Sequence, residues 1–109
     1  MFTSGTTGVS KGCLLSHCYA VRTAENMIGP FRITAYDVAY TPYLLSHIGP
    51  AFYDILPTLM TGGRVVLRDG FSLSNFWPEL VRFGVTWFMF LGSVQQLLYA
   101  APPCPEERL

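Results

Sequence analysis

One stretch near the start of the chain guides the interpretation of all the rest: Phe2-Thr3-Ser4-Gly5-Thr6-Thr7-Gly8-Val9-Ser10-Lys11-Gly12. Its three glycines allow tight turns and let the backbone come close to a bound group. Successive backbone N–H groups in such turns can form an anion-binding nest, and the five hydroxyl side chains add donors. Because Lys11 adds a mobile positive charge, the stretch suits a polyphosphate. A flexible surface linker is the alternative, since runs of Gly, Ser and Thr are common in linkers.

The stretch is not the P-loop of nucleoside triphosphatases. That pattern needs Gly directly before Lys and Ser or Thr directly after it. Here Ser10 precedes Lys11 and Gly12 follows it.

Downstream of this stretch, strand-like and helix-like segments alternate. The pattern predicts strands at 13–15, 38–43, 64–67 and 85–91, and helices at 17–28, 48–59, 73–83 and 93–101. Five signals place the helix ends and breaks: Ser16 as an N-cap, Gly29-Pro30 as a stop, Pro57 as a kink, Ser72 or Ser74 as a cap, and Gly84 as a C-cap. This alternation predicts an α/β fold with βαβ units on a mainly parallel sheet.

Composition indicates that much of the surface is meant to be covered by further protein. The 109 residues are enough for one small domain, and 50% of them are hydrophobic. Only 13% are charged, against about 25% in an ordinary globular domain. The net charge is zero and no basic stripe occurs, so nucleic acid is not an expected partner.

Two apolar stretches, 38–60 and 84–94, do not predict membrane spans. The first contains His47, Asp54 and three prolines, and the second has about eleven residues, against the ~20 that a bilayer requires. We therefore expect buried elements and no span, and a membrane-associated peptide is the less favoured alternative. Residues 1–12 do not look like a signal peptide.

The three cysteines, Cys13, Cys18 and Cys104, form no Cys-x-x-Cys pair and no four-ligand zinc pattern. Their usage fits a reducing cytoplasm, where we expect the protein to act.

Residues 2–12 resemble the signature loop of the adenylate-forming, or AMP-binding, superfamily. That superfamily includes acyl-CoA synthetases, luciferases and the adenylation domains of peptide synthetases. Its signature is an aromatic residue, a Thr/Ser-Gly-Thr-Thr-Gly core and Pro-Lys-Gly. Ser10 stands in place of the usual Pro, which loosens the loop but removes no binding group.

The likeness extends along nearly the whole chain. Four further segments resemble the family: 14–17, 42–49, 62–67, and 71–77 with 84–86. The spacing between Pro42 and His47 is longer than the usual form. The segment from Phe71 to Trp77, together with Phe90-Leu91-Gly92, is most similar to the carnitine/crotonobetaine-CoA ligase branch.

The resemblance implies that residues 1–109 are part of the large N-terminal domain of an acyl-activating enzyme, with a phosphate loop at 2–12 and βα units at 13–101. The parent would be an ATP-dependent acid–thiol ligase of fatty acid metabolism. It would activate a small-molecule carboxylic acid as an acyl-adenylate and transfer the acyl group to coenzyme A, with Mg²⁺ on the phosphates.

The resemblance also implies roles for individual residues. Lys11 would stabilise the charge of the leaving pyrophosphate as the catalytic residue. Phosphate binding would fall to Thr3, Ser4, Gly5, Thr6, Thr7, Gly8 and Lys11, with Thr6 or Thr7 as a candidate Mg²⁺ ligand. His47 would line the acyl pocket or lie beside the adenylate, and a structural histidine at a strand end is the alternative. Four carboxylates form no recognisable pair, and we assign them no catalytic or binding role: Asp37, Asp54, Asp69 and Glu79.

Several family parts do not occur in the chain, among them the Tyr-Gly-x-Thr-Glu segment and the C-terminal lysine of adenylation. We therefore expect the isolated chain to be inactive without the remainder of its own protein. The alternative is a stand-alone phosphate-binding or interaction module without catalysis. The sequence does not separate coenzyme A from a carrier protein as acceptor, nor does it name the acyl substrate.

Overall fold

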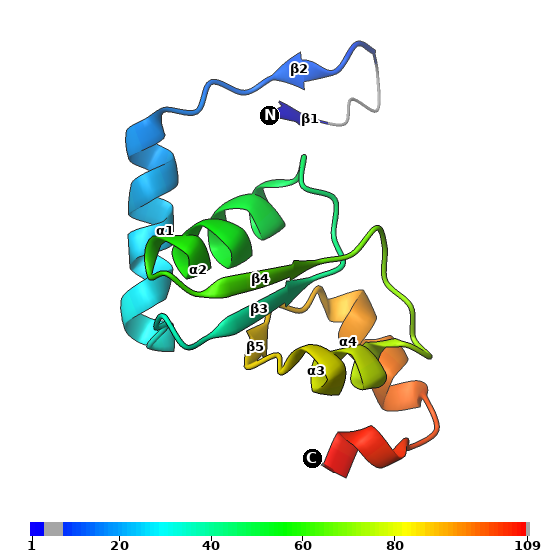
Figure 1. Cartoon of the computed structure of the whole chain (residues 1–109). Coiled ribbons are helices and arrows are strands. Elements are labelled where there is room, and N and C mark those ends of the chain that lie inside the picture. Colours follow the sequence, from blue (N-terminus) through cyan, green and yellow to red (C-terminus); the bar gives the residue numbers. More distant parts are fainter. Residues whose placement is uncertain (4–7, 109) are drawn as a thin grey trace.

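A three-stranded parallel sheet lies at the centre of the computed structural model, which describes residues 1–3 and 8–108 (Figure 1). The strand order is β4-β3-β5, with β4 at Arg64–Leu67, β3 at Val38–Thr41 and β5 at Trp87–Phe88. Every residue of β3 is buried, which is typical of a parallel strand covered on both faces. The predicted α/β class with a parallel sheet is therefore confirmed.

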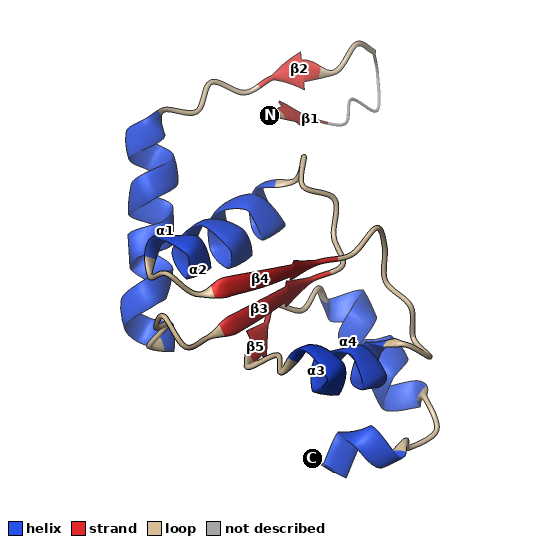
Figure 2. Ribbon diagram, viewed as in Figure 1, coloured by secondary structure: helices blue, strands red, loops and turns tan. Residues whose placement is uncertain are grey.

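Helices cover both faces of this sheet (Figure 2). On one face a continuous helical segment, η1 (Gly49–Ile55) followed by α2 (Leu56–Met60), packs on β3 and β4, and α1 (His17–Phe31) packs against that segment. The other face carries α3 (Phe76–Phe83) and α4 (Gly92–Ala100), and the short 3₁₀ helix η2 (Pro105–Arg108) lies beside α3. The main core forms on this second face, where Tyr40, Phe76 and Leu80 are buried together.

The order of the strands reverses at β3: the chain steps from β3 to its neighbour β4, then crosses back over β3 to reach β5 on the other side. The chain passes from β3 to β4 through η1 and α2 on one face, and from β4 to β5 through α3 on the other face. At their carboxyl ends the neighbours β3 and β5 therefore continue onto opposite faces, β3 into η1 and β5 into α4. Ligands of open α/β sheets bind at such switch points.

Helix α1 begins where the sequence predicted and ends later. The Ser16 hydroxyl accepts a hydrogen bond from the Tyr19 N–H at 3.0 Å, which confirms the N-cap. The predicted stop at Gly29-Pro30 is wrong, because a proline in the last turn removes only one donor. The helix ends instead at Arg32, which adopts φ 54°, while the N–H groups of Arg32 and Ile33 bond back at 3.1 and 3.0 Å.

Pro57 does not break the second helical segment. The seven residues of η1 form a wide π-helix, and the Leu56 N–H bonds to the Ala51 carbonyl five residues back. Pro57 stands at the change to the four-residue spacing of α2, where its missing N–H is tolerated. The helix therefore continues to Met60, and the wide turn places Asp54 in the interior.

The second half of the chain matches the prediction with shifted ends. Helix α3 starts at Phe76, and Ser72 and Ser74 lie 3.3 Å apart at their hydroxyls instead of capping it. Gly84 ends α3 with φ 62°, as predicted. The strands expected at 38–43 and 85–91 are shorter, because Pro42 has no N–H to extend the ladder beyond β3.

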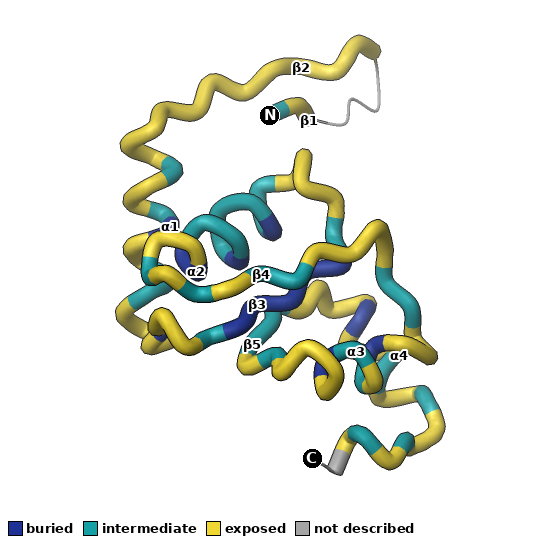
Figure 3. The backbone as a smooth tube through the Cα atoms, in the orientation of Figure 1, coloured by how far each residue is buried: buried dark blue, intermediate teal, exposed yellow. Residues whose placement is uncertain are grey.

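Exposed residues make up the N-terminal ladder and much of α1 (Figure 3), and large exposed apolar side chains occur along the described chain from Phe2 to Tyr99. Leu14, Val9 and Tyr36 are almost fully exposed. Among residues 1–3 and 8–108, no helix combines the length and apolarity that crossing a bilayer requires.

Candidate functional site

A short antiparallel ladder joins the two ends of the glycine-rich stretch. Strand β1 (Phe2–Thr3) pairs with β2 (Lys11–Gly12), so that Thr3 lies opposite Lys11. The Cys13 N–H extends the ladder to the Met1 carbonyl at 2.7 Å. The strand predicted at 13–15 is therefore wrong, because the pairing residues lie two positions earlier and form their own small sheet.

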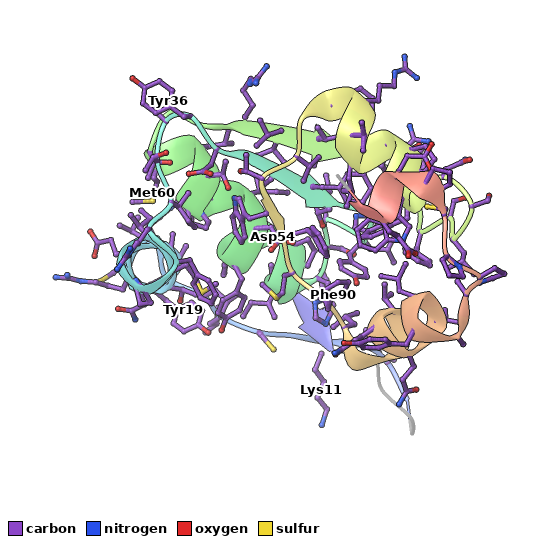
Figure 4. All side chains as sticks on the ribbon, turned by 90° about the horizontal axis from the view of Figure 1, so that it is seen from below. Lys11, Tyr19, Tyr36, Asp54, Met60 and Phe90 are labelled. Atoms are coloured by element: carbon purple, nitrogen blue, oxygen red, sulfur yellow. The ribbon has the colours of Figure 1, made fainter. Side chains whose placement is uncertain are left out.

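The ladder positions only some of the predicted phosphate-binding residues. Lys11 is exposed and points away from the body of the protein (Figure 4). Gly8 is exposed as well. Ser4, Gly5, Thr6 and Thr7 lie outside the described residues, so their roles stay predictions.

His47 follows the carboxyl end of β3 and has a defined hydrogen-bonding state. Its Nδ1 accepts the Gly49 N–H at 3.1 Å, which leaves Nε2 to carry the proton of a neutral imidazole. A Cβ added at Gly49 would lie 3.2 Å from that Nδ1. The absence of a side chain at Gly49 therefore leaves room for this close contact.

An apolar cavity of about 210 Å³ opens at the topological switch point. Its walls come from the segments that follow β3 and β5: Tyr43, Leu44, His47, Gly49, Pro50, Asp54, Met89 and Leu91. The Leu91 N–H donates to the Tyr43 hydroxyl at 3.1 Å and so ties the two walls together. We call this space the switch-point cavity.

A second cavity, of about 370 Å³, connects the N-terminal ladder to His47. Its lining comes from Met1, Phe2, Cys13 and Leu15 on one side and from Ser46, His47 and Ile48 on the other. His47 therefore lines both cavities and lies between the ends of the glycine-rich stretch and the switch-point cavity. The structure brings His47 next to the paired ends of the predicted phosphate loop.

Asp54 is a titratable group whose burial the sequence analysis missed. It is 1% exposed, and the polar side chain beside its carboxyl is that of Thr41, which is 0% exposed. Burial raises the pKa of this carboxyl to about 7, while a hydrogen bond with the buried Thr41 hydroxyl acts in the opposite direction. The sequence held no local signal for this burial, because it depends on the wide π-helical turn of η1.

Asp37 directly precedes β3, at the amino ends of the strands and away from the switch point, and it stabilises the fold. Thr86 donates its hydroxyl to one carboxylate oxygen at 2.7 Å, and Thr34 donates its hydroxyl and N–H to the other at 2.8 and 2.7 Å. The bonds from Thr86 and then Thr34 hold the pKa of Asp37 below its usual range. This carboxylate fastens the start of β3 to the start of β5.

No protein cluster in the described part of the chain is suited to holding a metal alone. Within residues 1–3 and 8–108, no three His, Cys, Asp or Glu side chains lie close enough together to coordinate one ion.

Comparison with known proteins identifies the family. Residues 1–108 match the family of AMP-binding enzymes. The chain is 35% identical over 108 residues to human long-chain fatty acid transport protein 5, covering 99% of this chain and 16% of that protein. Across curated relatives it covers 16 to 20% of their length.

Two solved structures share the fold. One is ATP-bound MatB from Rhodopseudomonas palustris, with a TM-score of 0.82 and 26% identity over 94% of this chain and 20% of that one. The other is o-succinylbenzoate CoA synthetase from Bacillus subtilis with its acyl-adenylate intermediate, with a TM-score of 0.80 and 29% identity over 97% of this chain and 28% of that one. The extent of the family match, from residue 1 to residue 108, shows that this chain belongs to the AMP-binding enzymes.

Proposed function

We propose that this chain is the phosphate-loop region of an ATP-dependent acid–thiol ligase. One observation carries the proposal. The chain matches the AMP-binding enzymes throughout, and its N-terminal ladder adjoins a cavity that shares His47 with the switch-point cavity. The cavity beside the ladder would receive the phosphates of ATP, and the switch-point cavity would receive the acyl group. The bond between the acyl carboxylate and the α-phosphate would form near His47.

The reaction has two steps. A carboxylate oxygen attacks the α-phosphorus of ATP, the bond to the β-phosphate breaks, and pyrophosphate leaves an acyl-adenylate behind. The sulfur of a thiol, which we take to be that of coenzyme A, then attacks the acyl carbon. The bond to AMP breaks, and the thiol proton passes to solvent.

In the first step the glycine-rich stretch would hold the β- and γ-phosphates. The ladder supports this role because it holds Thr3 opposite Lys11 and so closes the stretch between them. The hydroxyls of Thr3, Ser4, Thr6 and Thr7 would donate to phosphate oxygens, and Gly5 and Gly8 would let the backbone approach. The ammonium group of Lys11 would stabilise the charge that develops on pyrophosphate.

Mg²⁺ on the triphosphate would fit this arrangement. The ion usually keeps several waters and takes few protein ligands. Thr6 or Thr7 is the candidate protein ligand, and the ion would neutralise phosphate charge.

His47 would act at the junction of the two spaces. Because its Nδ1 is already engaged by the Gly49 N–H, its Nε2–H is the group that can donate to the substrate. A neutral donor suits an acyl carboxylate or adenylate oxygen without adding a fixed charge to the apolar cavity.

The remainder of the parent protein would complete the site. Large exposed apolar side chains, including Leu14, Val9 and Tyr36, would be covered by it. The curated relatives are at least about five times longer than the matched part, which supports this idea. We therefore propose that the isolated chain is inactive and that the cytoplasmic parent is active. The likeness to the carnitine/crotonobetaine branch stays a prediction.

The test is ATP–pyrophosphate exchange by the full-length parent with a panel of carboxylic acids. Replacing Lys11 with Ala should slow exchange by ~10²-fold or more, the scale for removing one preorganised charge-stabilising donor. Lys11→Arg should retain part of the rate because it keeps the charge. Arg22→Ala, which removes an exposed cation paired with Glu25 on α1, is the matched control. An unchanged rate in Lys11→Ala would remove Lys11 from the mechanism, and exchange by the isolated chain would contradict its inactivity.

A further inference from the structure

The switch-point cavity presents an almost entirely apolar surface to whatever occupies it. Its described lining contains no Lys or Arg, and the polar side chains among the lining residues are Tyr43, His47 and Asp54. The Asp54 carboxyl is 1% exposed and bonds to the buried Thr41 hydroxyl, so it adds no polar surface to the cavity. A charged or strongly hydrogen-bonding group bound there would therefore lose its water without gaining an equivalent partner from the described lining.

Internal hydrogen bonds hold the other two polar side chains. The Tyr43 hydroxyl accepts the Leu91 N–H at 3.1 Å, and this bond ties the wall that follows β3 to the wall that follows β5. Nδ1 of His47 accepts the Gly49 N–H at 3.1 Å, which leaves Nε2–H for the reacting carboxylate at the junction of the two cavities. Because the two walls are tied together, the protein fixes the size of the cavity before an acyl group binds.

The volume of the cavity limits the length of the group that it can hold. An apolar cavity of about 150 Å³ accommodates benzene, with its six carbon atoms. At the same packing, the switch-point cavity of about 210 Å³ holds about eight carbon atoms. With the carboxyl group beside His47, an acid of about nine carbon atoms fills the space.

We propose that the switch-point cavity selects carboxylic acids with an unsubstituted apolar tail of about eight carbon atoms, and that Met89 limits the length of that tail. The inference rests on the proposed function, because it takes this cavity as the acyl pocket. Three long aliphatic side chains line the cavity: Leu44, Met89 and Leu91. Leu44 and Leu91 are 74% and 49% exposed, whereas Met89 is only partly exposed, so Met89 is the one held inside the protein. Met89 acts as a specificity-determining residue.

Polar and very long acids are the less favoured occupants. A second carboxylate or an ammonium group would bring a charge into an apolar space whose described lining offers no ionised partner, which is unfavourable. A hydroxyl group would give up its hydrogen bonds to water for the same apolar surface. A tail much longer than about eight carbon atoms would extend beyond the cavity and would gain no further burial in it.

The experiment measures kcat/KM for ATP–pyrophosphate exchange by the full-length parent with unbranched acids from butanoate to hexadecanoate. Each added methylene should raise kcat/KM about fourfold, the gain expected from its burial, until the tail reaches about eight carbon atoms. Longer acids should gain nothing more. For octanoate, an ω-hydroxyl or a second carboxylate should lower kcat/KM by about tenfold or more, because the added group loses its water.

Variants of Met89 test which residue limits the tail. Met89→Ala removes about three heavy atoms from the wall, so the optimum should move to acids longer by about two or three carbon atoms. Met89→Leu, which nearly conserves the volume, should keep the wild-type optimum. Met60→Ala, at a half-exposed position outside the cavity lining, is the matched control and should leave the profile unchanged.

Three results would overturn the inference: a wild-type optimum below hexanoate or above dodecanoate, an ω-hydroxy or dicarboxylic acid that equals or exceeds unsubstituted octanoate, or an optimum that Met89→Ala leaves in place. If Met89→Ala does not fold, as judged by loss of ATP binding, the milder truncation Met89→Val takes its place. No exchange with any acid in the wild type would reject the proposed function itself, whereas exchange with a different profile rejects only the selection by this cavity.

Discussion

The buried Asp54 carboxyl makes the stability of the protein depend on pH in a direction opposite to that of ordinary salt-bridged carboxylates. Its pKa rises from 3.8 to about 7 on folding, so the folded state binds more protons than the unfolded state between these values. The contribution of Asp54 to the free energy of unfolding is therefore greatest below pH 4. It falls as the pH rises towards 7 and levels off above that value. Worked between pH 5 and pH 8, the two pKa values give a loss of about 2 to 3 kcal/mol from this one group.

The assay is urea unfolding of the parent protein and its Asp54→Asn variant at pH 5 and pH 8. Other titrating groups are common to both proteins, so the difference between them isolates Asp54. We expect Asp54→Asn to gain stability relative to the wild type on going from pH 5 to pH 8. Equal pH dependence of the two proteins, or a wild type that gains more, would refute the reasoning that Asp54 is buried and neutral.

Two further predictions concern the fold. Gly63→Ala would place a Cβ 2.8 Å from both the Asp37 carbonyl oxygen and the Thr58 Cγ2, and this overpacking should lower the free energy of unfolding by about 1 to 3 kcal/mol. Urea unfolding checks it, with Gly70→Ala as the control because nothing lies within 4 Å of that position; equal effects of the two changes would contradict it. Ser16→Ala should lower the free energy of unfolding by about 1 kcal/mol through loss of the α1 N-cap. If the Ser16→Ala variant unfolds at the same urea concentration as the wild type, the cap contributes nothing.

Local rules predicted the fold class and most elements, because the relevant signals are short-range. Ser16 and Gly84 cap helices where their chemistry predicts. The misplaced ends have tertiary causes. Helix α1 passes through Gly29-Pro30 because buried Ile33 and the turn at Arg32 fix its end. The strand expected at 13–15 failed because pairing depends on a partner, and Phe2–Thr3 takes Lys11–Gly12.

The site was predictable only where a sequence motif defined it. His47 was identified through a motif, and the structure adds that it joins two cavities. Asp54 was passed over because a single acidic residue in an apolar helix carries no local sign of its burial. That burial depends on the π-helical turns of η1 before Pro57 and on the neighbouring segment that follows β5, and neither follows from helical spacing.

The most direct test of the central claim is calorimetric titration of ATP into the parent enzyme with the order of residues 3–12 scrambled. Composition and charge are preserved, so only the arrangement of hydroxyls, glycines and Lys11 changes. If these residues enclose the triphosphate, ATP affinity should fall by ~10²-fold or more, as expected when several preorganised donors are lost. Wild-type affinity in the scrambled protein would contradict the assignment and would leave the shared scaffold as the only likeness to the family.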